Sequence, residues 1–478
     1  MKMGKLRNGI ANLPVALKAS VAFFFSSVIT SGISYITTPI YTRILSAEEY
    51  GRVSVFLTWL QILGVVAMFC LYMGVFNNGM IDYPDKRDRY SFSLLALSNI
   101  ITVLFGTVFL IIYPFIKSAM GLSYPLIFLM LAIFLFQPAY NFWVSRQRYE
   151  FKYKFVVLFA VLCAVVSPLT AILACLYADY GERLYPRIFG AEIPLIIIYI
   201  GFYFYIAKKS SFKVDRSFWK AALLFNLPLI PHYLSTYLLN SCDKIMISKL
   251  VGDDATAYYS VAYSVAAIAT IVWNAVNSSL VPYTYEKCKE KDYKSISKVV
   301  IPILALFAVV CLFVIMLAPE VVAIMATKDY MEAVYVIPPI VGGVFFQVQY
   351  YIYANVVYFY KKPRYVMYAS VLATAANVVL NYFCIRIFGY LAAGYTTLAC
   401  FIIQAVADYV AMRKVVGEDV YNMKYVAALS IAVLCISLCS NLTYDYPVVR
   451  YALVVLMIVC MVIFRKKIIG LISAIKKK

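Results

Sequence analysis

Residues 299–318 read VVIPILALFAVVCLFVIMLA, twenty consecutive residues without a charged side chain. A helix rises 1.5 Å per residue, so about 20 apolar residues are enough to cross the hydrocarbon core of a bilayer. The stretch is continuously apolar, whereas a strand of an outer-membrane barrel would alternate between apolar and polar residues. It therefore predicts a transmembrane α-helix.

Comparable stretches fill the chain, of whose 478 residues 64% are hydrophobic and 14% are charged. About fourteen predicted spans of this length lie near residues 20–40, 53–76, 91–116, 123–144, 155–177, 189–207, 221–242, 257–281, 299–318, 334–358, 366–386, 389–411, 425–441 and 447–464. Little chain remains for a soluble domain. The expected fold class is all-α, a polytopic membrane protein. Its function is expected within the membrane or at its faces, as transport, channel formation or catalysis on a lipid.

Lysines and arginines divide unevenly between the two sides of this predicted membrane protein. With the N-terminus placed in the cytoplasm, roughly three quarters of the 43 Lys and Arg residues fall in cytoplasmic loops and tails. This asymmetry predicts that both termini are cytoplasmic, in a multi-pass protein of the cytoplasmic membrane. It also explains most of the net charge of +20 through the topology and the anionic lipids of the cytoplasmic leaflet. Nucleic acid is therefore not expected as a partner.

Motifs of several other function classes are missing from the sequence. There is no Gly-rich phosphate loop and no Walker motif, so this chain is not expected to hydrolyse ATP. The sequence has a single histidine, and its 11 cysteines show no metal-ligand spacing. No long outer loop carries a convincing set of catalytic residues. We therefore expect no cofactor, no metal, no disulfide and no enzymatic activity.

Hydroxyl side chains form a stripe along the first predicted span. The stripe consists of Ser27, Ser31, Ser34 and Thr38. Their spacings of four, three and four residues place them on one face of a helix. Small hydroxyl residues also serve helix packing, or donate to their own backbone. The stripe as a whole favours a polar cavity, with Thr38 as a candidate lining residue.

The seventh predicted span carries the strongest polar pattern. His232, Thr236, Asn240 and Asp243 follow one another at spacings of four, four and three, and so share a face. Two prolines just before them should disturb the helix and free backbone carbonyls. An acid within a span is expensive in lipid, so Asp243 is expected to face protein or water. Its partner is expected on another span.

Amide side chains elsewhere are candidates of lower specificity. They include Asn274 in the eighth span, Gln347 in the tenth, and Asn377 and Asn381 in the eleventh, while Arg146 ends the fourth. Amides offer the neutral donors and acceptors that sugar hydroxyls need. They serve equally well as contacts between helices. Both uses remain open.

Two loops six spans apart resemble each other. Residues 43–51 read RILSAEEYG and residues 249–258 read KLVGDDATAY, each with an acidic pair after a small residue. This echo is compatible with a duplicated six-span unit of the kind found in transporters. It predicts an N-terminal lobe at 1–207 and a second lobe at 208–411. Residues 412–478 would add two further helices and a basic tail.

The first loop, with the preceding TPIYTR at residues 38–43, is similar to a pattern of bacterial lipid-linked oligosaccharide flippases. So is DKIMISKLVG at residues 243–252. These are the Wzx-type polysaccharide exporters of the multidrug/oligosaccharidyl-lipid/polysaccharide superfamily, and the resemblance extends over the whole chain in length and span number. Ala47 departs from the pattern, because relatives often have proline there.

The resemblance implies two six-helix lobes around a central cavity and alternating access to the two leaflets. The implied substrate is a polyprenyl-pyrophosphate-linked oligosaccharide, moved from the inner to the outer leaflet for surface polysaccharide synthesis. A polysaccharide polymerase and chain-length machinery are implied as further partners, besides the bilayer itself. The cations Arg43, Arg146, Lys244 and Lys249 are candidates for the pyrophosphate, although each can instead extend to lipid headgroups.

Three alternatives remain open from the sequence. A cation-coupled multidrug exporter of the same superfamily would also use an acid such as Asp243. A lipid II flippase is a close relative of the same design. A polymerase or ligase is disfavoured because it would need a large catalytic outer loop.

The sequence leaves the energy source open. Coupling to H⁺ through Asp243 or His232, coupling to Na⁺, and transport without either are equally compatible with the sequence.

Overall fold

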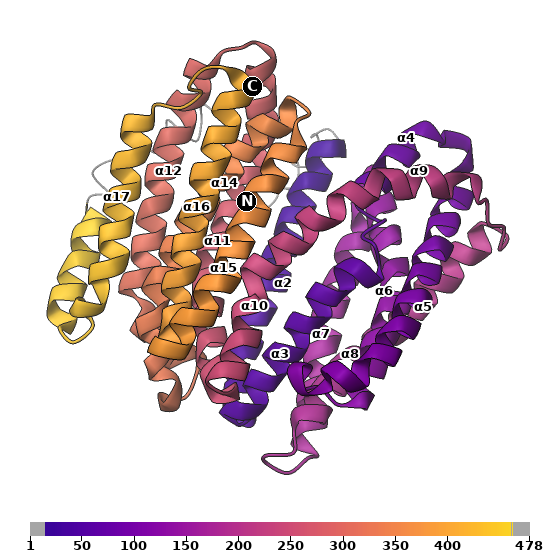
Figure 1. The fold of residues 1–478 in the computed structure, drawn as a ribbon, viewed down its shortest axis with the longest axis horizontal. Coiled ribbons are helices and arrows are strands. Elements are labelled where there is room, and N and C mark those ends of the chain that lie inside the picture. The colour runs from indigo at the N-terminus through magenta and orange to yellow at the C-terminus, as the bar shows by residue number, and fades with distance from the viewer. Residues whose placement is uncertain (1–14, 460, 462–478) are drawn as a thin grey trace, which may run out of the picture. The chain divides into compact units, whose positions relative to one another are not determined.

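The computed structural model describes residues 15–459 and residue 461. Helices connected by short turns make up this part of the chain, and it contains no strand (Figure 1). The predicted all-α fold is therefore confirmed. The chain forms two compact units that divide between Leu234 and Ser235. The lobe boundaries predicted at 207/208 and 411/412 stay predictions.

Twelve helices in the described part are long and apolar enough to cross a membrane. Two more helices coincide with the first and last predicted spans: α2 (Val15–Ile44) and the shorter apolar helix Pro447–Val459. Every predicted span thus corresponds to a helix, although residues 460 and 462–464 of the last lie outside the described residues. The polytopic architecture with about fourteen helices is the one expected from apolar run length alone.

The first unit packs its helices around aromatic side chains. In chain order its elements are α2 (Val15–Ile44), α3 (Ala47–Ala67), α4 (Gly74–Asp82), η1 (Pro84–Lys86), α5 (Arg87–Met120), α6 (Tyr124–Tyr149), α7 (Tyr153–Leu176), α8 (Leu184–Lys209), α9 (Ser217–Asn226) and η2 (Leu227–Leu229). Phe142 meets Phe76 edge-on at 5.0 Å between ring centroids, and Trp143 lies 4.5 Å from Phe202. Close packing also requires a glycine, because a β-carbon at position 79 would lie 2.1 Å from the Tyr90 ring.

The second predicted span is wrong at both ends, since the structure replaces 53–76 by α3. The helix begins earlier because Ser46 and Glu49 form a reciprocal capping box at its N-terminus. It ends at Ala67, and Phe69 and Cys70 then adopt the left-handed conformation with φ of 55° and 46°. The apolar sequence continues past this turn, so hydropathy alone does not reveal the break.

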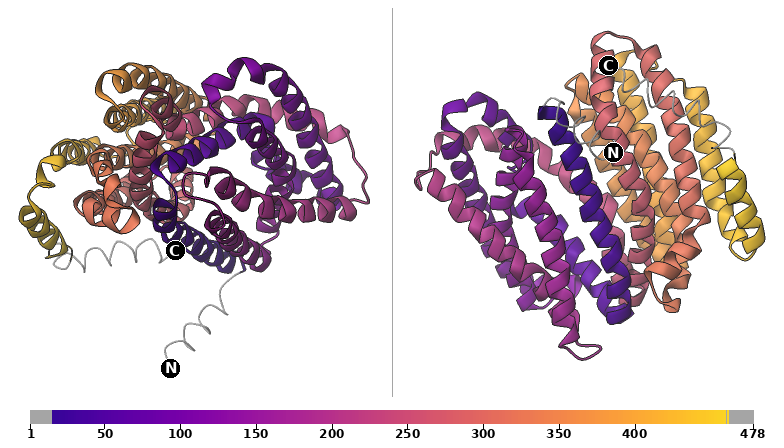
Figure 2. Two further views of the ribbon diagram at one scale, coloured as in Figure 1. Left: turned by 90° about the horizontal axis from the view of Figure 1, so that it is seen from below. Right: turned by 180° about the vertical axis from the view of Figure 1, so that it is seen from behind.

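The second unit is built around one central helix. Its elements are α11 (Asp253–Lys289), α12 (Tyr293–Met316), α13 (Ala318–Met325), η3 (Lys328–Val336), α14 (Ile337–Phe359), α15 (Pro363–Phe388), α16 (Leu391–Val416), α17 (Met423–Cys439), η4 (Ser440–Thr443) and Pro447–Val459, while α10 (Ile230–Leu250) enters it from the first unit. The span that includes α14 is 83% buried, the most of any candidate span, and both α16 and α11 pack against it. Figure 2 shows the same helices from two further directions.

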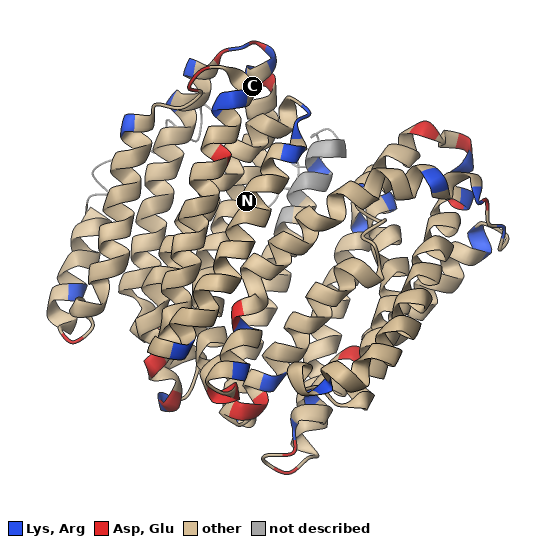
Figure 3. Ribbon diagram, viewed as in Figure 1, with Lys and Arg blue, Asp and Glu red and all other residues tan. Residues whose placement is uncertain are grey.

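Charge distribution agrees with a membrane setting. In each unit the charged residues gather toward the helix ends, and the long middle sections are almost free of them (Figure 3). Large apolar side chains nevertheless point outward from these sections; Phe115, for example, is 84% exposed. Such a surface is unfavourable in water and suits lipid.

An ion pair between buried Arg450 and half-buried Glu320 connects the last described helix to α13. The Arg450 guanidinium donates to both carboxylate oxygens of Glu320, over 2.8 and 2.5 Å, and also to the carbonyl of Met316. The Tyr451 hydroxyl donates to the same carboxylate over 2.6 Å. Arg450 is 3% exposed, so loss of its partner would leave a buried charge uncompensated.

We expect Glu320→Gln to destabilise the second unit by about 1–3 kcal/mol, because a bidentate charged contact to a buried arginine is lost. The midpoint of thermal unfolding of the purified protein in detergent measures this. Glu48→Gln is the matched control, since Glu48 lies 3.8 Å from Arg52 in an exposed pair that contributes little. Equal midpoints for the two variants would contradict the structural role of the pair.

The same pair predicts a pH dependence. Burial raises the pKa of Glu320, but the hydrogen bond from Tyr451 and the contact with Arg450 together lower it by more, so its pKa lies below the ordinary 4.5. A carboxyl whose folded-state pKa is depressed stabilises the fold above its unfolded-state pKa and loses this contribution as the pH falls through the folded value. The difference in unfolding midpoint between wild type and Glu320→Gln should therefore shrink below pH 4.5. A constant difference would contradict the prediction.

Candidate functional site

Asp243 lies on α10 with its side chain completely buried in the second unit. Three neutral donors from three other helices reach its carboxylate. The Tyr259 hydroxyl and Thr397 Oγ1 each donate to Oδ2 over 2.7 Å, and Asn381 Nδ2 donates to Oδ1 over 2.6 Å. These donors lie on α11, α16 and α15, so the expectation that Asp243 finds its partners on other spans is confirmed.

A second layer of polar side chains holds these donors in place. Asn381 Oδ1 accepts from Thr396, and Asn377 Oδ1 accepts from Asn381 Nδ2 and from the Cys242 thiol, each over 3.1 Å. Asn377 Nδ2 in turn approaches the Thr397 hydroxyl at 3.4 Å. None of the five side chains is more than 5% exposed. We call Asp243 and the polar side chains around it the Asp243 network: Asp243, Tyr259, Asn377, Asn381, Thr396 and Thr397.

Cations do not take part in this network. None of the ion pairs formed by the described residues includes Asp243. Lys244 follows it in the chain but faces another direction, with its ammonium 5.5 Å from the centroid of the Tyr263 ring. Hydroxyl and amide groups supply the short hydrogen bonds to the carboxylate, and the charge of Lys244 acts on it electrostatically without forming an ion pair.

The donor set suits a proton or a small, hard cation. Carboxylate, amide carbonyl and hydroxyl oxygens converge here, and oxygen ligands are what such cations prefer. Hydroxyl groups can rotate to present a lone pair in place of a proton. The described residues hold no group of three or more His, Cys, Asp or Glu side chains that could bind a metal ion.

The helix breaks at the two prolines, as the sequence predicts: Pro228 lies in η2 and Pro231 in the first turn of α10. Helix α9 ends at Asn226, the short η2 follows, and α10 begins at Ile230. The Asn226 side chain donates to the carbonyl of Phe69 in the first unit. This bond satisfies a carbonyl in the left-handed turn that follows α3.

Other candidates from the second half of the chain are distributed along α10, α11 and α14. Asn240 Nδ2 donates to a carbonyl of its own helix, and Asn240 Oδ1 accepts from Gln347 Nε2 over 2.9 Å, so the structure brings these two candidates together. His232 is half-buried near the start of α10. Lys249 and Asn274 are exposed. None of these five belongs to the Asp243 network.

In the first unit, Thr38 Oγ1 donates to the carbonyl of Ser34 over 2.9 Å, one helical turn earlier. Other hydroxyls of α2 donate to their own backbone in the same way. Arg43 is exposed at the end of α2, and its guanidinium donates to the carbonyl of Pro39 over 2.7 Å. Arg43 therefore presents its charge at a helix terminus.

Arg146 is held by two carboxylates. Its guanidinium donates to Glu150 over 3.0 Å and to Asp88, which lies at the start of α5. Burial raises the pKa of Glu150, but hydrogen bonds from Lys152 and Arg146 lower it by more, so the carboxylate stays charged near neutral pH. The arrangement compensates Arg146 within the protein.

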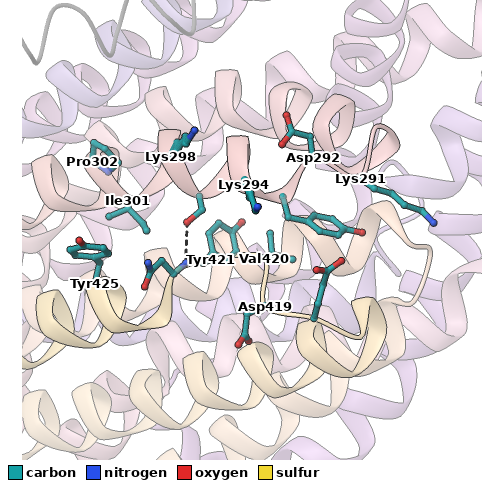
Figure 4. A pocket seen from close by; sticks show the side chains of 14 residues that line it. Lys291, Asp292, Lys294, Lys298, Ile301, Pro302, Asp419, Val420, Tyr421 and Tyr425 are labelled. Carbon is teal, nitrogen blue, oxygen red and sulfur yellow. Dashed lines mark hydrogen bonds between the residues drawn. The ribbon is translucent and has the colours of Figure 1, made fainter.

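The second unit also contains an open groove of about 690 Å³ between the first turns of α12 and the segment that joins α16 to α17. Figure 4 shows the Lys294 ammonium directed into this groove and the Lys298 ammonium directed away from it. The amide of Asn422 donates to Ser297 Oγ across it over 3.0 Å. The groove therefore lies at the first turns of two candidate spans and has a charged rim.

Sequence patterns do not single out Thr396 and Thr397, because hydroxyl residues recur in many spans and only the fold brings these two to Asp243. Asn377, Asn381 and Tyr259 are visible as polar residues of spans, without any indication of their shared partner. The stronger signal is Asp408 on α16, an acid within a predicted span. An acid at this position is as unfavourable in lipid as Asp243, so its residue type alone marks it as a candidate.

The fold is that of a polytopic α-helical membrane protein. Residues 16–287, more than half of the chain, match the family described as polysaccharide biosynthesis protein. Residues 228–383 also match the MatE family. The chain belongs to the polysaccharide biosynthesis protein family, within the multidrug/oligosaccharidyl-lipid/polysaccharide superfamily of transporters.

Similar proteins support this assignment. The Lsg locus protein 1 of Haemophilus influenzae is 22% identical over 374 residues, which cover 76% of this chain and 89% of that protein. The structure of the lipid II flippase MurJ in an inward closed conformation aligns with a TM-score of 0.65 at 14% identity, covering 95% of this chain and 100% of MurJ. An inward-facing multidrug resistance MATE transporter aligns with a TM-score of 0.60 at 14% identity, covering 85% and 98%. At these identities the two structures show a shared fold.

We expect Thr397→Val to lower the stability of the protein by about 1–2 kcal/mol, because a buried donor to a carboxylate is lost without a change in shape. The midpoint of thermal unfolding in detergent measures this. Thr107→Val is the control, since the exposed Thr107 hydroxyl donates to its own helix at Val103. An equally small effect at both positions would show that Thr397 contributes nothing to holding Asp243.

Proposed function

We propose that this protein flips a polyprenyl-pyrophosphate-linked oligosaccharide from the inner to the outer leaflet of the bacterial cytoplasmic membrane. The observation that carries the proposal is the match of residues 16–287 to the polysaccharide biosynthesis protein family. The relative encoded at the Lsg locus supports it. The proposed topology places both termini in the cytoplasm.

The physical problem that such a protein solves is desolvation. A sugar pyrophosphate carries charge and many hydroxyl groups, and its transfer into hydrocarbon without hydrogen-bonding partners costs many kcal/mol. Alternating access lowers this barrier if polar side chains replace water around the head group while the lipid tail stays in the bilayer. Amides and hydroxyls suit the sugar, and a cation suits the pyrophosphate.

Among the candidate cations, Arg43 and Lys244 are the ones that we propose bind the pyrophosphate. Arg43 is exposed, and the Lys244 ammonium lies over an aromatic ring with no carboxylate in an ion pair with it among the described residues. Arg146 is compensated by two acids, and we assign it a structural role. The Asn240–Gln347 pair is proposed to contact the sugar, together with Thr38, His232, Lys249 and Asn274 as peripheral groups.

We further propose that a proton or Na⁺ at Asp243 supplies the energy. Binding of a cation would neutralise the carboxylate and compete for the oxygens of Asn381 and Thr397. Hydrogen bonds that tie α10 to α15 and α16 would then change with the cation. A ligand that favours one arrangement of helices shifts the population toward it.

A second candidate function is cation-coupled export of drugs. The MatE match at residues 228–383 and the fold shared with a multidrug resistance MATE transporter favour it. Lipid II flipping is a third possibility within the same fold, supported by the likeness to MurJ. These alternatives differ in substrate. They can be distinguished by which lipid-linked compound, if any, accumulates in the inner leaflet when the protein is depleted.

We expect depletion of the protein to trap lipid-linked oligosaccharide in the inner leaflet, because no other step exposes the head group outside. A lectin or glycosidase that reaches only the outer leaflet of intact cells or spheroplasts measures this. Trapped lipid II instead would favour the MurJ-like alternative. Normal exposure of both lipids, in a host without a redundant flippase, would contradict flipping and favour drug export.

Variants connect this assay to the residues. Arg43→Ala and Asp243→Asn should each reduce outer-leaflet exposure several-fold at unchanged protein abundance. Arg386→Ala is the matched control, since Arg386 is also an exposed arginine at a helix end and its guanidinium donates to Tyr382 of its own helix. Wild-type exposure in the Arg43 and Asp243 variants at matched abundance would remove both residues from the mechanism.

A further inference from the structure

Asp408 is a second acid inside the second unit, on α16, and it is distinct from the Asp243 network. Its side chain is completely buried within the candidate span Leu391–Val416. Among the described residues, none forms a hydrogen bond with either carboxyl oxygen. A charged carboxylate in such a place is strongly disfavoured, since neither water nor a donor replaces its hydration.

Gln404 lies one turn before Asp408 on the same face of α16. Its Nε2 donates to Ser370 Oγ of α15 over 3.2 Å, whereas its Oε1 receives no donor. Three buried oxygen acceptors therefore lie on one face of α16 without a donor. A single proton on Asp408 supplies the missing donor, and residues four apart on a helix are close enough for that hydrogen to reach Gln404 Oε1.

No nearby charge takes the place of that proton. The phenol of Tyr350 is the titratable group that approaches Asp408 from α14, and α15 contributes the neutral Ser370 on this side. On α16 itself, Arg413 pairs with Asp419 at 3.7 Å, and Lys414 lies over the Tyr365 ring of α15. The element η3, which carries Lys328, Asp329 and Glu332, packs against α16 near Gly394, at the opposite end of the helix from Asp408. Among the described residues, no ion pair includes Asp408.

A line of buried polar side chains joins Asp408 to the Asp243 network. On α16 the line consists of Thr396, Thr397, Cys400, Gln404 and Asp408, and on α15 of Ser370, Thr374, Asn377 and Asn381. Hydrogen bonds cross between the two helices at Thr396–Asn381, Asn377–Thr397 and Gln404–Ser370. From Thr397 to Asp408 the helix rises roughly 16 Å. A polar line of this length is costly in a membrane protein unless it serves a purpose.

We propose that Asp408 holds a proton and that this buried polar line passes the proton between Asp408 and Asp243. In the transfer, the O–H bond of Asp408 breaks and leaves a carboxylate, and Asp243 gains the proton and becomes neutral. The pair gains and loses no charge. The inference rests on the proposed coupling at Asp243 and specifies it, because it names the coupling ion as H⁺ and its second binding site.

Infrared difference spectroscopy of the full-length protein in nanodiscs tests, without any substrate, whether Asp408 holds a proton. A protonated carboxyl gives a carbonyl stretch that shifts in D₂O. We expect such a band in the wild type, its loss in Asp408→Asn, and a shifted but persistent band in Gln404→Leu. Asp408→Asn preserves the shape and offers an N–H to Gln404, so it should fold. Gln349→Leu is the matched control, as Gln349 is a buried glutamine that donates to Ser430 outside the line.

The rate of hydrogen–deuterium exchange at the Asp243 carboxyl tests whether the buried polar line passes protons between Asp408 and Asp243. At a pH low enough to protonate Asp243, its band is identified by its loss in Asp243→Asn. After mixing with D₂O, exchange at Asp243 should slow several-fold in Asp408→Asn and in Gln404→Leu, and stay at the wild-type rate in Gln349→Leu.

Three outcomes would overturn the proposal. The first is a spectrum of Asp408→Asn that matches the wild type, which would mean that Asp408 carries no proton. The second is loss of the Asp408 band when NaCl replaces KCl, which would make the ligand Na⁺. The third is unchanged exchange at Asp243 in both line variants. Both readouts are independent of the substrate, so a failure of the flippase proposal in the export assay would be recognised separately.

Discussion

The need to satisfy every polar group without water is the constraint on which this structure depends. Hydrocarbon offers no hydrogen bonds, so an acid in a span must find its donors within the protein. Asp243 finds them on three helices, and each bond fixes the position of α10 against α11, α15 or α16. The same hydrogen bonds that stabilise the buried carboxylate also make the arrangement of these helices sensitive to its charge. Structural support and susceptibility to a cation therefore share one cause.

The rigidity around this network comes from α14. Glycines allow the neighbouring helices to approach it closely: a β-carbon at position 342 would lie 2.5 Å from Ser437 Oγ, and one at 343 would lie 3.1 Å from the Phe401 ring. Close backbone approach through small residues is how helices associate in membranes, where no hydrophobic force drives them together. Asn240 and the network are thus positioned against a tightly packed helix, to which Gln347 adds a direct hydrogen bond.

Two acids on this framework differ in what surrounds them. Asp243 has three donors and suits either charge state, whereas Asp408 has none and suits only the neutral form. Because the two are joined by polar side chains, a proton can have two stable positions with a path between them. Such a difference in environment is how a protein moves a proton in a definite direction with side chains of the same type. It also gives a transporter of the polysaccharide biosynthesis family a means of linking ion movement to helix movement.

The sequence by itself determined that the chain is an all-α polytopic membrane protein, because run length and apolar composition act locally and need no knowledge of packing. It also placed an important acid at Asp243 and predicted the proline break before α10, since both follow from residue chemistry. Tertiary structure alone decided that Thr396, Thr397, Asn377 and Asn381 converge on that acid, and that α3 ends at Ala67 within an apolar stretch. Those outcomes depend on which helix faces which, and residues far apart in the chain carry no local signal of their future neighbours.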